Sequence, residues 1–259
     1  MGKEKINNLF IKNKKEILSI YLTTGYPEID SMPVLAEKLA GAGVDFLELG
    51  MPYSDPLADG ETIQYSSSIA LKNGIDFDQY FNQAKAVRQN IDIPLLFMGY
   101  FNQVLRIGID TFLDKCVDSG IDGLIIPDMP PEVYKNKYKP IFDKYDLGLS
   151  FLITPTTSDE RIKMLDELSS GFVYVVSTSS TTGKTIGFSD SQIDYFKRIN
   201  KLNLNNPMVI GFGISDKQTF RIANKHSDGA IIGSAFIKAL KDSKDIEKTA
   251  MEFAQNIIK

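Results

Sequence analysis

The sequence has very few of the residues that build disulfides, metal sites and histidine-based catalytic centres. Its 259 residues include one cysteine, Cys116, one histidine, His226, and no tryptophan. A single Cys cannot form an internal disulfide, and this cysteine usage favours a reducing cytoplasm. One His and one Cys cannot assemble a multi-histidine zinc site or a cysteine cluster, so we expect no metal. His226 lies where a helix is expected to end, a position typical of a solvated or capping residue.

Long apolar runs and an excess of positive charge are also missing. The longest apolar segments, at 123–127 and 172–176, are as long as a strand, well short of the ~20 residues that a spanning helix needs. Residues 1–18 mix charged with isolated apolar positions and lack the continuous apolar segment of a secretory signal. The formal net charge is −4. We therefore expect neither a membrane nor a nucleic-acid partner, and any anionic ligand must be bound by local groups.

Short β-branched segments alternate with amphipathic stretches along the chain, without a long linker. This alternation is typical of parallel strands joined by helices. Strands are predicted at 18–23, 45–49, 94–98, 122–126, 148–153, 172–177, 207–211 and 229–232. Helices are predicted at 31–41, 61–72, 109–119, 132–144, 158–168, 189–201, 216–225 and 234–257. We expect the α/β class, with a single (β/α)₈ TIM barrel that covers residues 1–259 as one domain.

Two further segments fall outside these eight units, and one other architecture competes with the barrel. Residues 3–14 predict an extra N-terminal helix at the bottom of the barrel, and residues 76–90 predict an insertion before the third strand. An open doubly wound sheet also alternates strands and helices, but its glycine-rich fingerprint would follow the first strand. Here that strand runs into LTTGYPEID, and the only G-x-G after a strand is at 211–213. A glycine turn that late in the chain lies where a barrel binds phosphate, so the barrel is favoured.

The second predicted strand carries a buried acid. Glu48 lies between Leu47 and Leu49, and because side chains alternate along a strand, its carboxylate points away from both leucines into the barrel mouth. An apolar wall raises the pKa of a carboxylate towards neutrality, which suits proton transfer. The alternative is a Glu neutralised by a buried cation, which is less favoured because no Lys or Arg lies nearby in the sequence.

The loop after this strand carries two more acids. Asp55 and Asp59 lie in MPYSDPLADGETIQ, residues 51–64, ahead of a predicted helix. Asp59, followed by Gly60 and Thr62, fits a turn with a helix N-terminal cap as well as it fits a catalytic acid. Spacing alone leaves both roles open.

Glycine- and hydroxyl-rich segments follow the last three predicted strands, at 179–184, 211–215 and 233–234. Small residues let backbone N–H groups converge on an anion, and a helix N-terminus adds partial positive charge. Each segment alone fits an ordinary turn, but together they predict a phosphorylated ligand. A subset of the apolar residues near the strand ends would form a pocket for an aromatic substrate above that phosphate. The full set near the strand ends, most of which is expected to pack in the core, is Tyr21, Phe97, Tyr100, Phe101, Ile126, Phe151, Ile153, Tyr174 and Phe212.

The segment LELGMPYSDPLADGETIQ, residues 47–64, resembles the tryptophan synthase α-subunit family, whose signature is a glutamate at the end of strand two and an aspartate in the following loop. The resemblance extends over essentially the full length. It is also carried by LTTGYP at 22–27, MGYFNQ at 98–103, DGLIIPDMPPE at 122–132, STSSTTG at 177–183, GFGIS at 211–215 and IIGSAFIK at 231–238. The chain departs from the family at Ser180, where Gly is usual, and at Glu61, where Pro is common.

This resemblance implies a cofactor-free lyase of tryptophan biosynthesis that cleaves indole-3-glycerol phosphate to indole and glyceraldehyde 3-phosphate. It implies Glu48 and Asp59 as the catalytic acids. The substrate-binding residues that it implies are Tyr21, Tyr100, Tyr174, Thr182, Gly183, Phe212, Gly213, Gly233 and Ser234. It also implies a partner, the pyridoxal-phosphate-dependent tryptophan synthase β subunit of an αββα heterotetramer, which the loop bearing Asp55 would touch.

Three alternatives remain open at this level. The first is another phosphate-binding barrel enzyme of tryptophan or histidine biosynthesis, which would share the late glycine turns but not the pair Glu48 and Asp59. The second is a free-standing lyase that releases indole without a partner. The third is a catalytically silent relative that only binds and activates a partner subunit, and the two intact acids speak against it.

Overall fold

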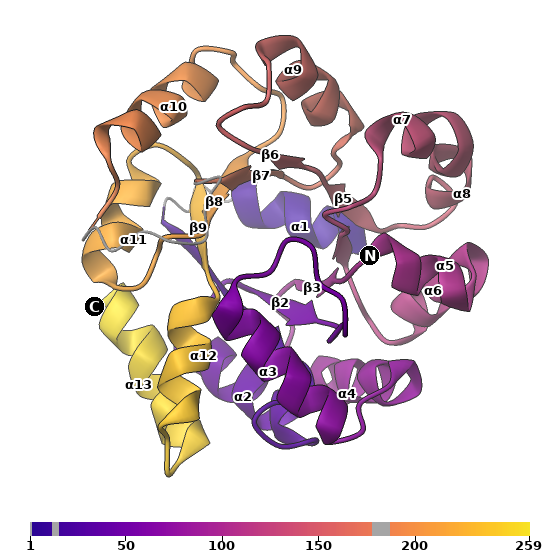
Figure 1. The fold of residues 1–259 in the computed structure, drawn as a ribbon, viewed down its shortest axis with the longest axis vertical. Coiled ribbons are helices and arrows are strands. Elements are labelled where there is room, and N and C mark those ends of the chain that lie inside the picture. The colour runs from indigo at the N-terminus through magenta and orange to yellow at the C-terminus, as the bar shows by residue number, and fades with distance from the viewer. Residues whose placement is uncertain (1, 12–15, 178–186) are drawn as a thin grey trace.

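The computed structural model describes residues 2–11, 16–177 and 187–259, and its strands form one parallel sheet that returns on itself (Figure 1). The strands are β1 (Ile17–Thr23), β2 (Phe46–Gly50), β3 (Leu95–Met98), β4 (Gly123–Ile125), β5 (Gly148–Ser150), β6 (Leu152–Ile153), β7 (Val173–Val176), β8 (Met208–Gly211) and β9 (Gly229–Ile232). Their order is β5-β4-β3-β2-β1-β9-β8-β7-β6. β5 pairs with β4 and β6 pairs with β7, so the segment 148–153, predicted as one strand, closes the barrel with its two halves. The predicted (β/α)₈ barrel is confirmed.

Alternation along the strands divides the apolar side chains between two cores. Leu18, Ile20 and Leu22 of β1 face outward and belong to the core between the sheet and the helices. The inward side chains form a second core inside the barrel. Its members are Ile6, Ile17, Phe46, Leu96, Ile125, Phe172, Tyr174, Val209 and Ile231. A polar side chain in the inward series therefore lies among apolar neighbours, at the centre of the molecule.

Within the described residues, eight helical segments surround the barrel. They are α2 (Ser31–Gly41), α4 (Phe77–Asn90), α6 (Ile109–Asp118), the run of α7 (Pro131–Val133), the π-helical turn η1 (Tyr134–Tyr138) and α8 (Lys139–Phe142), then α9 (Asp159–Leu168), α10 (Asp190–Asn200), α11 (Lys217–Asn224) and α13 (Ile246–Ile258). Three more helices, α3 (Glu61–Lys72), α5 (Phe101–Ile107) and α12 (Ser234–Lys241), follow the carboxyl ends of β2, β3 and β9. None of the helices in the described ranges is long and apolar enough to cross a membrane.

The assignment of the second barrel unit was wrong. The sequence predicted 61–72 as the outer helix and 76–90 as an insertion. In the structure α4 packs against α2 and α6, whereas α3 contacts α12 and β1 (Figure 1). The additional helix of this unit is therefore α3. Both segments are amphipathic, and only their tertiary contacts decide which of them joins the ring.

The predicted helix 234–257 was also wrong, since it is two helices. α12 ends at Lys241, and α13 begins after Asp245, whose carboxylate accepts the Lys248 N–H at 3.0 Å. This N-terminal cap starts a new helix axis. The predicted helix 132–144 is interrupted by η1 ahead of Pro140, which has no N–H to donate to the preceding turn. The helix α5 was not predicted.

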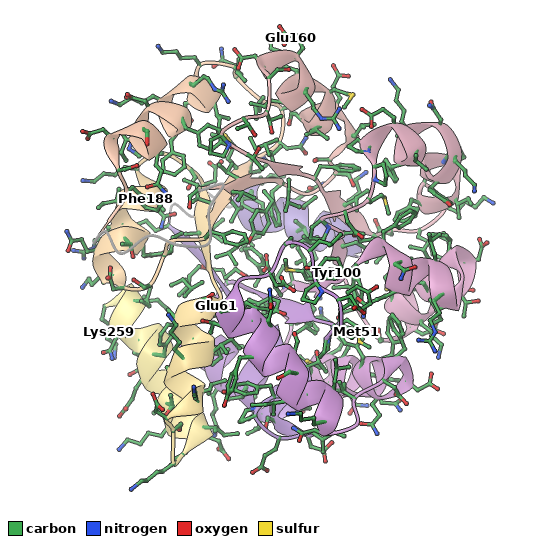
Figure 2. The ribbon with its side chains drawn as sticks, viewed as in Figure 1. Met51, Glu61, Tyr100, Glu160, Phe188 and Lys259 are labelled. Carbon is green, nitrogen blue, oxygen red and sulfur yellow. The ribbon has the colours of Figure 1, made fainter. Side chains whose placement is uncertain are left out.

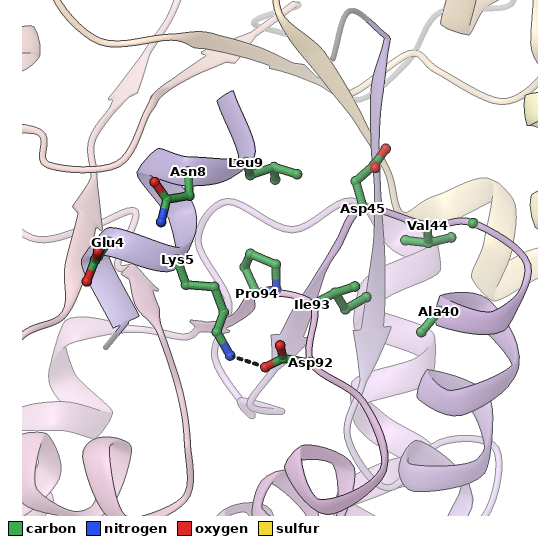
Figure 3. A pocket seen from close by; sticks show the side chains of 11 residues that line it. Glu4, Lys5, Asn8, Leu9, Ala40, Val44, Asp45, Asp92, Ile93 and Pro94 are labelled. Atoms are coloured by element: carbon green, nitrogen blue, oxygen red, sulfur yellow. Dashed lines mark hydrogen bonds and ion pairs between the residues drawn. The ribbon is translucent and has the colours of Figure 1, made fainter. Parts of the chain in front are cut away.

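The predicted N-terminal helix is present as α1 (Gly2–Ile11) and covers the bottom of the barrel. Its buried Ile6 lies against the first strand residues Gly123 and Gly148, on which a Cβ would lie 2.6 Å and 2.9 Å from Ile6 Cδ1. Figure 1 shows α1 behind the sheet, on the far side from α3. Beside α1 is an open hollow of about 790 Å³, where Lys5 and Asp92 form an ion pair of 2.6 Å (Figure 3). This hollow lies where strands begin, at the opposite end from the predicted site.

Candidate active site

Glu48 lies inside the barrel on β2, on the face that strand alternation predicts. Its side chain is 0 % exposed, and neither carboxylate oxygen has a hydrogen-bonding partner among the described residues. The alternative of a Glu neutralised by a buried cation therefore finds no support in that part of the chain. Removal from water disfavours the charged form, and burial raises the pKa of Glu48 to about 8. At neutral pH the carboxyl group is protonated. Because its pKa is close to neutral pH, it gives up and takes back the proton readily, as a general acid and base must.

Asp59 lies in the loop between β2 and α3 and does not cap that helix. The N-terminal cap of α3 is Gly60, which has no side chain with which to bond the helix end. The Asp59 carboxylate instead accepts a hydrogen bond from the Tyr100 hydroxyl. Burial raises the pKa of Asp59, and this hydrogen bond lowers it. The Tyr100 hydroxyl also accepts the Ala58 N–H at 3.1 Å, so one phenol holds the acid and its loop.

The two acids lie among three tyrosines. Tyr100 lies towards the middle of the face in Figure 2, whereas Glu160 projects from the rim. Tyr21 is the register partner of Glu48 on the neighbouring strand, and Tyr174 faces inward on β7. Burial raises the pKa of Tyr21 and of Tyr174, and the nearby charges of Asp59 and Glu48 raise both further. The structure thus brings the two acids and the three tyrosines together at the barrel mouth.

Glycines make room for two of these tyrosines. A Cβ on Gly50 would lie 2.5 Å from Tyr21 Cε2, and a Cβ on Gly211 would lie 2.5 Å from Tyr174 Cε1. Real Cβ atoms essentially never approach another atom so closely. Each ring therefore lies across the strand end at which a side chain is missing.

Replacing Gly50 with Ala is expected to displace the Tyr21 ring and to lower the free energy of unfolding by about 1–3 kcal/mol, as overpacking of a core does. Urea unfolding measures this loss. The control is Gly41→Ala, because no atom lies within 4 Å of a Cβ built on Gly41. Gly41→Ala should leave the chain as stable as before or slightly more stable. Equal unfolding midpoints for the two variants would show that Tyr21 does not pack over Gly50.

The N-terminus of α12 lies beside the cluster of acids and tyrosines. Gly233 is the N-terminal cap of α12 and Ser234 is its first residue, so the first N–H groups of the helix have no intrahelical acceptor. A Cβ on Gly233 would lie 3.5 Å from Tyr21 Cβ, which places this helix end next to the tyrosines. A helix N-terminus with exposed N–H groups and a partial positive charge is suited to a phosphate.

The turn after β8 has an unusual backbone. Phe212 and Gly213 both adopt left-handed conformations, with φ of 68° and 73°. Ser177 at the end of β7 donates its hydroxyl to the Phe212 carbonyl at 2.7 Å, and the Phe212 and Tyr174 ring centres are 6.4 Å apart. A left-handed backbone costs a bulky residue on the order of 1–2 kcal/mol, and such strain clusters at functional sites.

The apolar residues expected around the mouth divide between the two cores. Tyr174 and Phe212 belong to or contact the inward core. The outward core contains Phe97, Phe101, Ile126, Phe151 and Ile153, and Tyr21 also contacts this core although it is the register partner of the inward Glu48. Only part of the set can therefore line a substrate pocket, because each step along a strand reverses the direction of the side chain.

The remaining predicted residues are Asp55, Thr182 and Gly183. Thr182, Gly183 and the departure Ser180 lie outside the described residues. Asp55 is exposed and accepts a hydrogen bond from the Ser54 hydroxyl at 2.5 Å. Within the ranges that the structure covers, no group of three or more His, Cys, Asp or Glu side chains could hold a metal ion.

Comparison with known proteins gives the family. The family model described as "Tryptophan synthase alpha chain" matches residues 7–258. The tryptophan synthase alpha chain of Flavobacterium johnsoniae is 52 % identical, covering 90 % of this chain and 92 % of that protein. The alpha chain of Karelsulcia muelleri is 48 % identical, covering 98 % of this chain and 99 % of the other.

Solved structures agree. A mutant tryptophan synthase alpha-subunit from Pyrococcus furiosus is 30 % identical with a TM-score of 0.86, covering 95 % of this chain and 98 % of that one. The tryptophan synthase complex from the same organism contains a chain that is 29 % identical with a TM-score of 0.85, at the same two coverages. Because the family model matches residues 7–258 and relatives about half identical to this chain cover nine tenths or more of it, the chain belongs to the tryptophan synthase alpha chain family.

Proposed function

We propose that Glu48 and Asp59 together catalyse the lyase reaction of this family, the cleavage of indole-3-glycerol phosphate to indole and glyceraldehyde 3-phosphate in tryptophan biosynthesis. One observation carries the proposal: two carboxyl groups in unlike surroundings share the barrel mouth. Glu48 is fully buried with a pKa of about 8, and Asp59 is held by Tyr100. When the surroundings of two carboxyl groups push their pKa values apart, one group can act as the acid and the other, as a carboxylate, can stabilise positive charge.

The first step uses the proton on Glu48. The protonated carboxyl group gives its proton to C3 of the indole ring, which leaves a positive charge shared with the ring nitrogen. Asp59, as a carboxylate, accepts the indole N–H and stabilises that charge. A neutral Glu48 at physiological pH fits this order, because a group with a pKa near 8 still carries the proton that the step needs.

The second step uses the carboxylate that Glu48 has become. It takes the proton of the side-chain hydroxyl next to C3, and the electrons of that O–H bond form the aldehyde carbonyl. The carbon–carbon bond breaks, and its electron pair returns to the ring and neutralises the positive charge. Glu48 ends protonated as it began, so the step is balanced without a metal, a Schiff base or a redox cofactor.

The rest of the site would bind the substrate. We infer that the glycerol phosphate lies at the end of α12, with Gly213, Gly233 and Ser234, and that Thr182 and Gly183 complete this site. Tyr21, Tyr100, Tyr174 and Phe212 would line the indole. The supporting observations are the glycine cap of α12 beside Tyr21 and the left-handed turn at Phe212 and Gly213.

We propose a β subunit that depends on pyridoxal phosphate as the partner, in an αββα complex that passes indole on. The support in this chain is the loop 51–60 at the edge of the site. Leu57 is 86 % exposed there, and the loop is tied to α5 by the hydrogen bond from Asn102 to the Tyr53 hydroxyl, at 2.9 Å. An apolar side chain so exposed beside Asp55 and Asp59 is suited to contact a partner and to transmit its binding to the acid.

The test of both proposals is indole release from indole-3-glycerol phosphate by the purified chain, with and without a β subunit. The chain alone should be slow, and the partner should raise the rate by about 10- to 100-fold, because small errors in positioning cost about that much. Fast release that the partner does not change would identify a free-standing lyase. No release under either condition would contradict the assigned roles of Glu48 and Asp59.

Two smaller proposals complete the description. We infer that residues 1–259 form one domain, since the first and last strands pair with each other as β1 and β9. We also infer a cytoplasmic location, since the single thiol, Cys116, is buried and free, as is typical of proteins in a reducing compartment.

A further inference from the structure

The inward side chains of the barrel stack in layers, because the strands are tilted and staggered. Register partners on successive strands run from Tyr21 on β1, near the mouth, through Glu48 on β2 to Gly148 at the start of β5. Each step from one strand to its partner on the next strand therefore moves towards the bottom of the barrel. The layer of Glu48 consists of Glu48, Ile125, Tyr174 and Ile231. The layer beneath it consists of Ser19, Leu96, Ser150 and Val209. The layer beneath Glu48 therefore contains two hydroxyl groups, and only that of Ser19 is on the strand next to Glu48, since β1 pairs with β2 whereas β5 lies three strands away.

Three polar atoms in these two layers have no partner among the described residues. They are the Ser19 hydroxyl oxygen and both oxygens of Glu48, and both side chains are 0 % exposed. The other unpartnered buried atoms in the described ranges belong to helices on the outside of the barrel. Natural proteins satisfy the large majority of buried polar atoms, with protein groups or with ordered water. Three such atoms at one place are a strong departure from that rule.

We propose that a buried water molecule binds between Ser19 and Glu48 inside the barrel, and that Ser19 thereby positions the Glu48 carboxyl group. A buried water needs two to four polar partners, and here the Ser19 hydroxyl and one Glu48 carboxyl oxygen supply two. Serine is also smaller than the Leu and Val that share its layer, which leaves room. The water occupies one Glu48 oxygen from below, so the other oxygen is directed upward to the substrate.

The consequence of this water is a hydrogen bond that favours the charged form of Glu48. The titratable groups that face Glu48 are Tyr21 on β1, Tyr174 on β7 and Asp59 in the loop above. Both phenols stay neutral across the working range, because burial raises the pKa of each. Asp59 is the one group among them that ionises in the acid range, so it does not affect the alkaline side of the pH profile. A change in the pH at which kcat/KM falls on the alkaline side therefore reports on Glu48.

The test is the pH dependence of kcat/KM in a set of Ser19 variants, measured with the β subunit. It rests on the proposed role of Glu48. In Ser19→Val the side chain fills the space of the water, and in Ser19→Ala the hydroxyl partner is lost. In both variants the fall of kcat/KM at alkaline pH, the alkaline limb of the profile, should move to higher pH by about one unit, since the carboxylate loses one hydrogen bond. KM should stay unchanged, because Ser19 lies below the substrate.

A control separates this effect from a change in packing. Ser119→Ala removes another buried hydroxyl, which bonds to the Cys116 carbonyl at 3.1 Å in α6, and should leave the profile unchanged. A purely structural role for Ser19 would lower stability without moving the limb.

A crystal structure of the chain at high resolution should show the water within hydrogen-bonding distance of Ser19 Oγ and one Glu48 oxygen. A dry interior, or a wild-type alkaline limb in Ser19→Val and Ser19→Ala, would overturn the inference. Glu48→Gln separates the two proposals. If it stays active, the proposed function fails. If it is inactive while the Ser19 variants keep the wild-type limb, only the role of the water fails.

Discussion

Replacing Glu48 with Gln lowers kcat for indole release by about 10³ or more, because the amide keeps the size of the side chain but can neither give nor take a proton. Replacing Asp59 with Asn lowers kcat by about 10²–10³, because a neutral amide stabilises the ring cation far less than a carboxylate does. KM should change little in either variant, since neither acid is placed on the phosphate. Steady-state assays of both variants with the β subunit measure this.

Glu61→Gln is the matched control for these variants. Glu61 follows Asp59 by two residues, and it is an exposed acid in the first turn of α3. The change from acid to amide is the same, but the Glu61 side chain is exposed to solvent, so kcat should stay within about twofold of wild type. Retention of more than a tenth of the wild-type kcat by Glu48→Gln would contradict the assigned proton transfer.

The pH profile of the wild-type chain is part of the same expectation. The first step needs protonated Glu48, so kcat/KM should fall as the pH rises through about 8, where Glu48 ionises. It also needs charged Asp59, so kcat/KM should fall on the acid side as Asp59 takes up a proton. An activity that keeps rising above pH 9 would mean that Glu48 must be ionised from the start.

The position of Glu48 could be predicted from the sequence, and the role of Asp59 could not. Leu47 and Leu49 mark the outward face of a short strand, so local alternation alone directs Glu48 inward. Whether Asp59 caps α3 depends on Tyr100, which lies 41 residues further along the chain. No local pattern contains that hydrogen bond. The resemblance to a family supplied the missing information.

The ring of helices shows the same limit. Residues 61–72 and 76–90 have similar amphipathic patterns, and the sequence cannot tell which segment packs between α2 and α6. The break after Lys241 left a signal that was missed, since Asp245 three residues before Lys248 is a typical N-terminal cap. The sequence also indicated the place of Ser19, because it lies two residues from the inward Ile17 on β1 and so faces the same way.

Replacing Glu48 with Gln should also stabilise the folded chain, increasingly so as the pH rises. Burial raises the pKa of Glu48 from 4.5 to about 8, so the folded state holds a proton that the unfolded state loses above pH 4.5. Stability linked to this proton is complete below pH 4.5 and is lost as the pH rises towards 8. Gln has no such proton to lose.

The size of this effect follows from the shift. Each pKa unit corresponds to about 1.4 kcal/mol, so the Gln variant should exceed the wild type in unfolding free energy by about 4 kcal/mol at pH 8, where folded Glu48 is half ionised. At pH 4 the two proteins should be equal within about 1 kcal/mol. Urea unfolding of the free chain between these pH values measures the difference, and Glu61→Gln shows the contribution of an exposed acid, which is close to zero. A difference that stays constant with pH would mean that folded Glu48 is already charged at neutral pH. The burial that gives this group its catalytic pKa is thus the same burial that destabilises the barrel, and a variant that gains stability while losing indole release would place both effects on one carboxyl group.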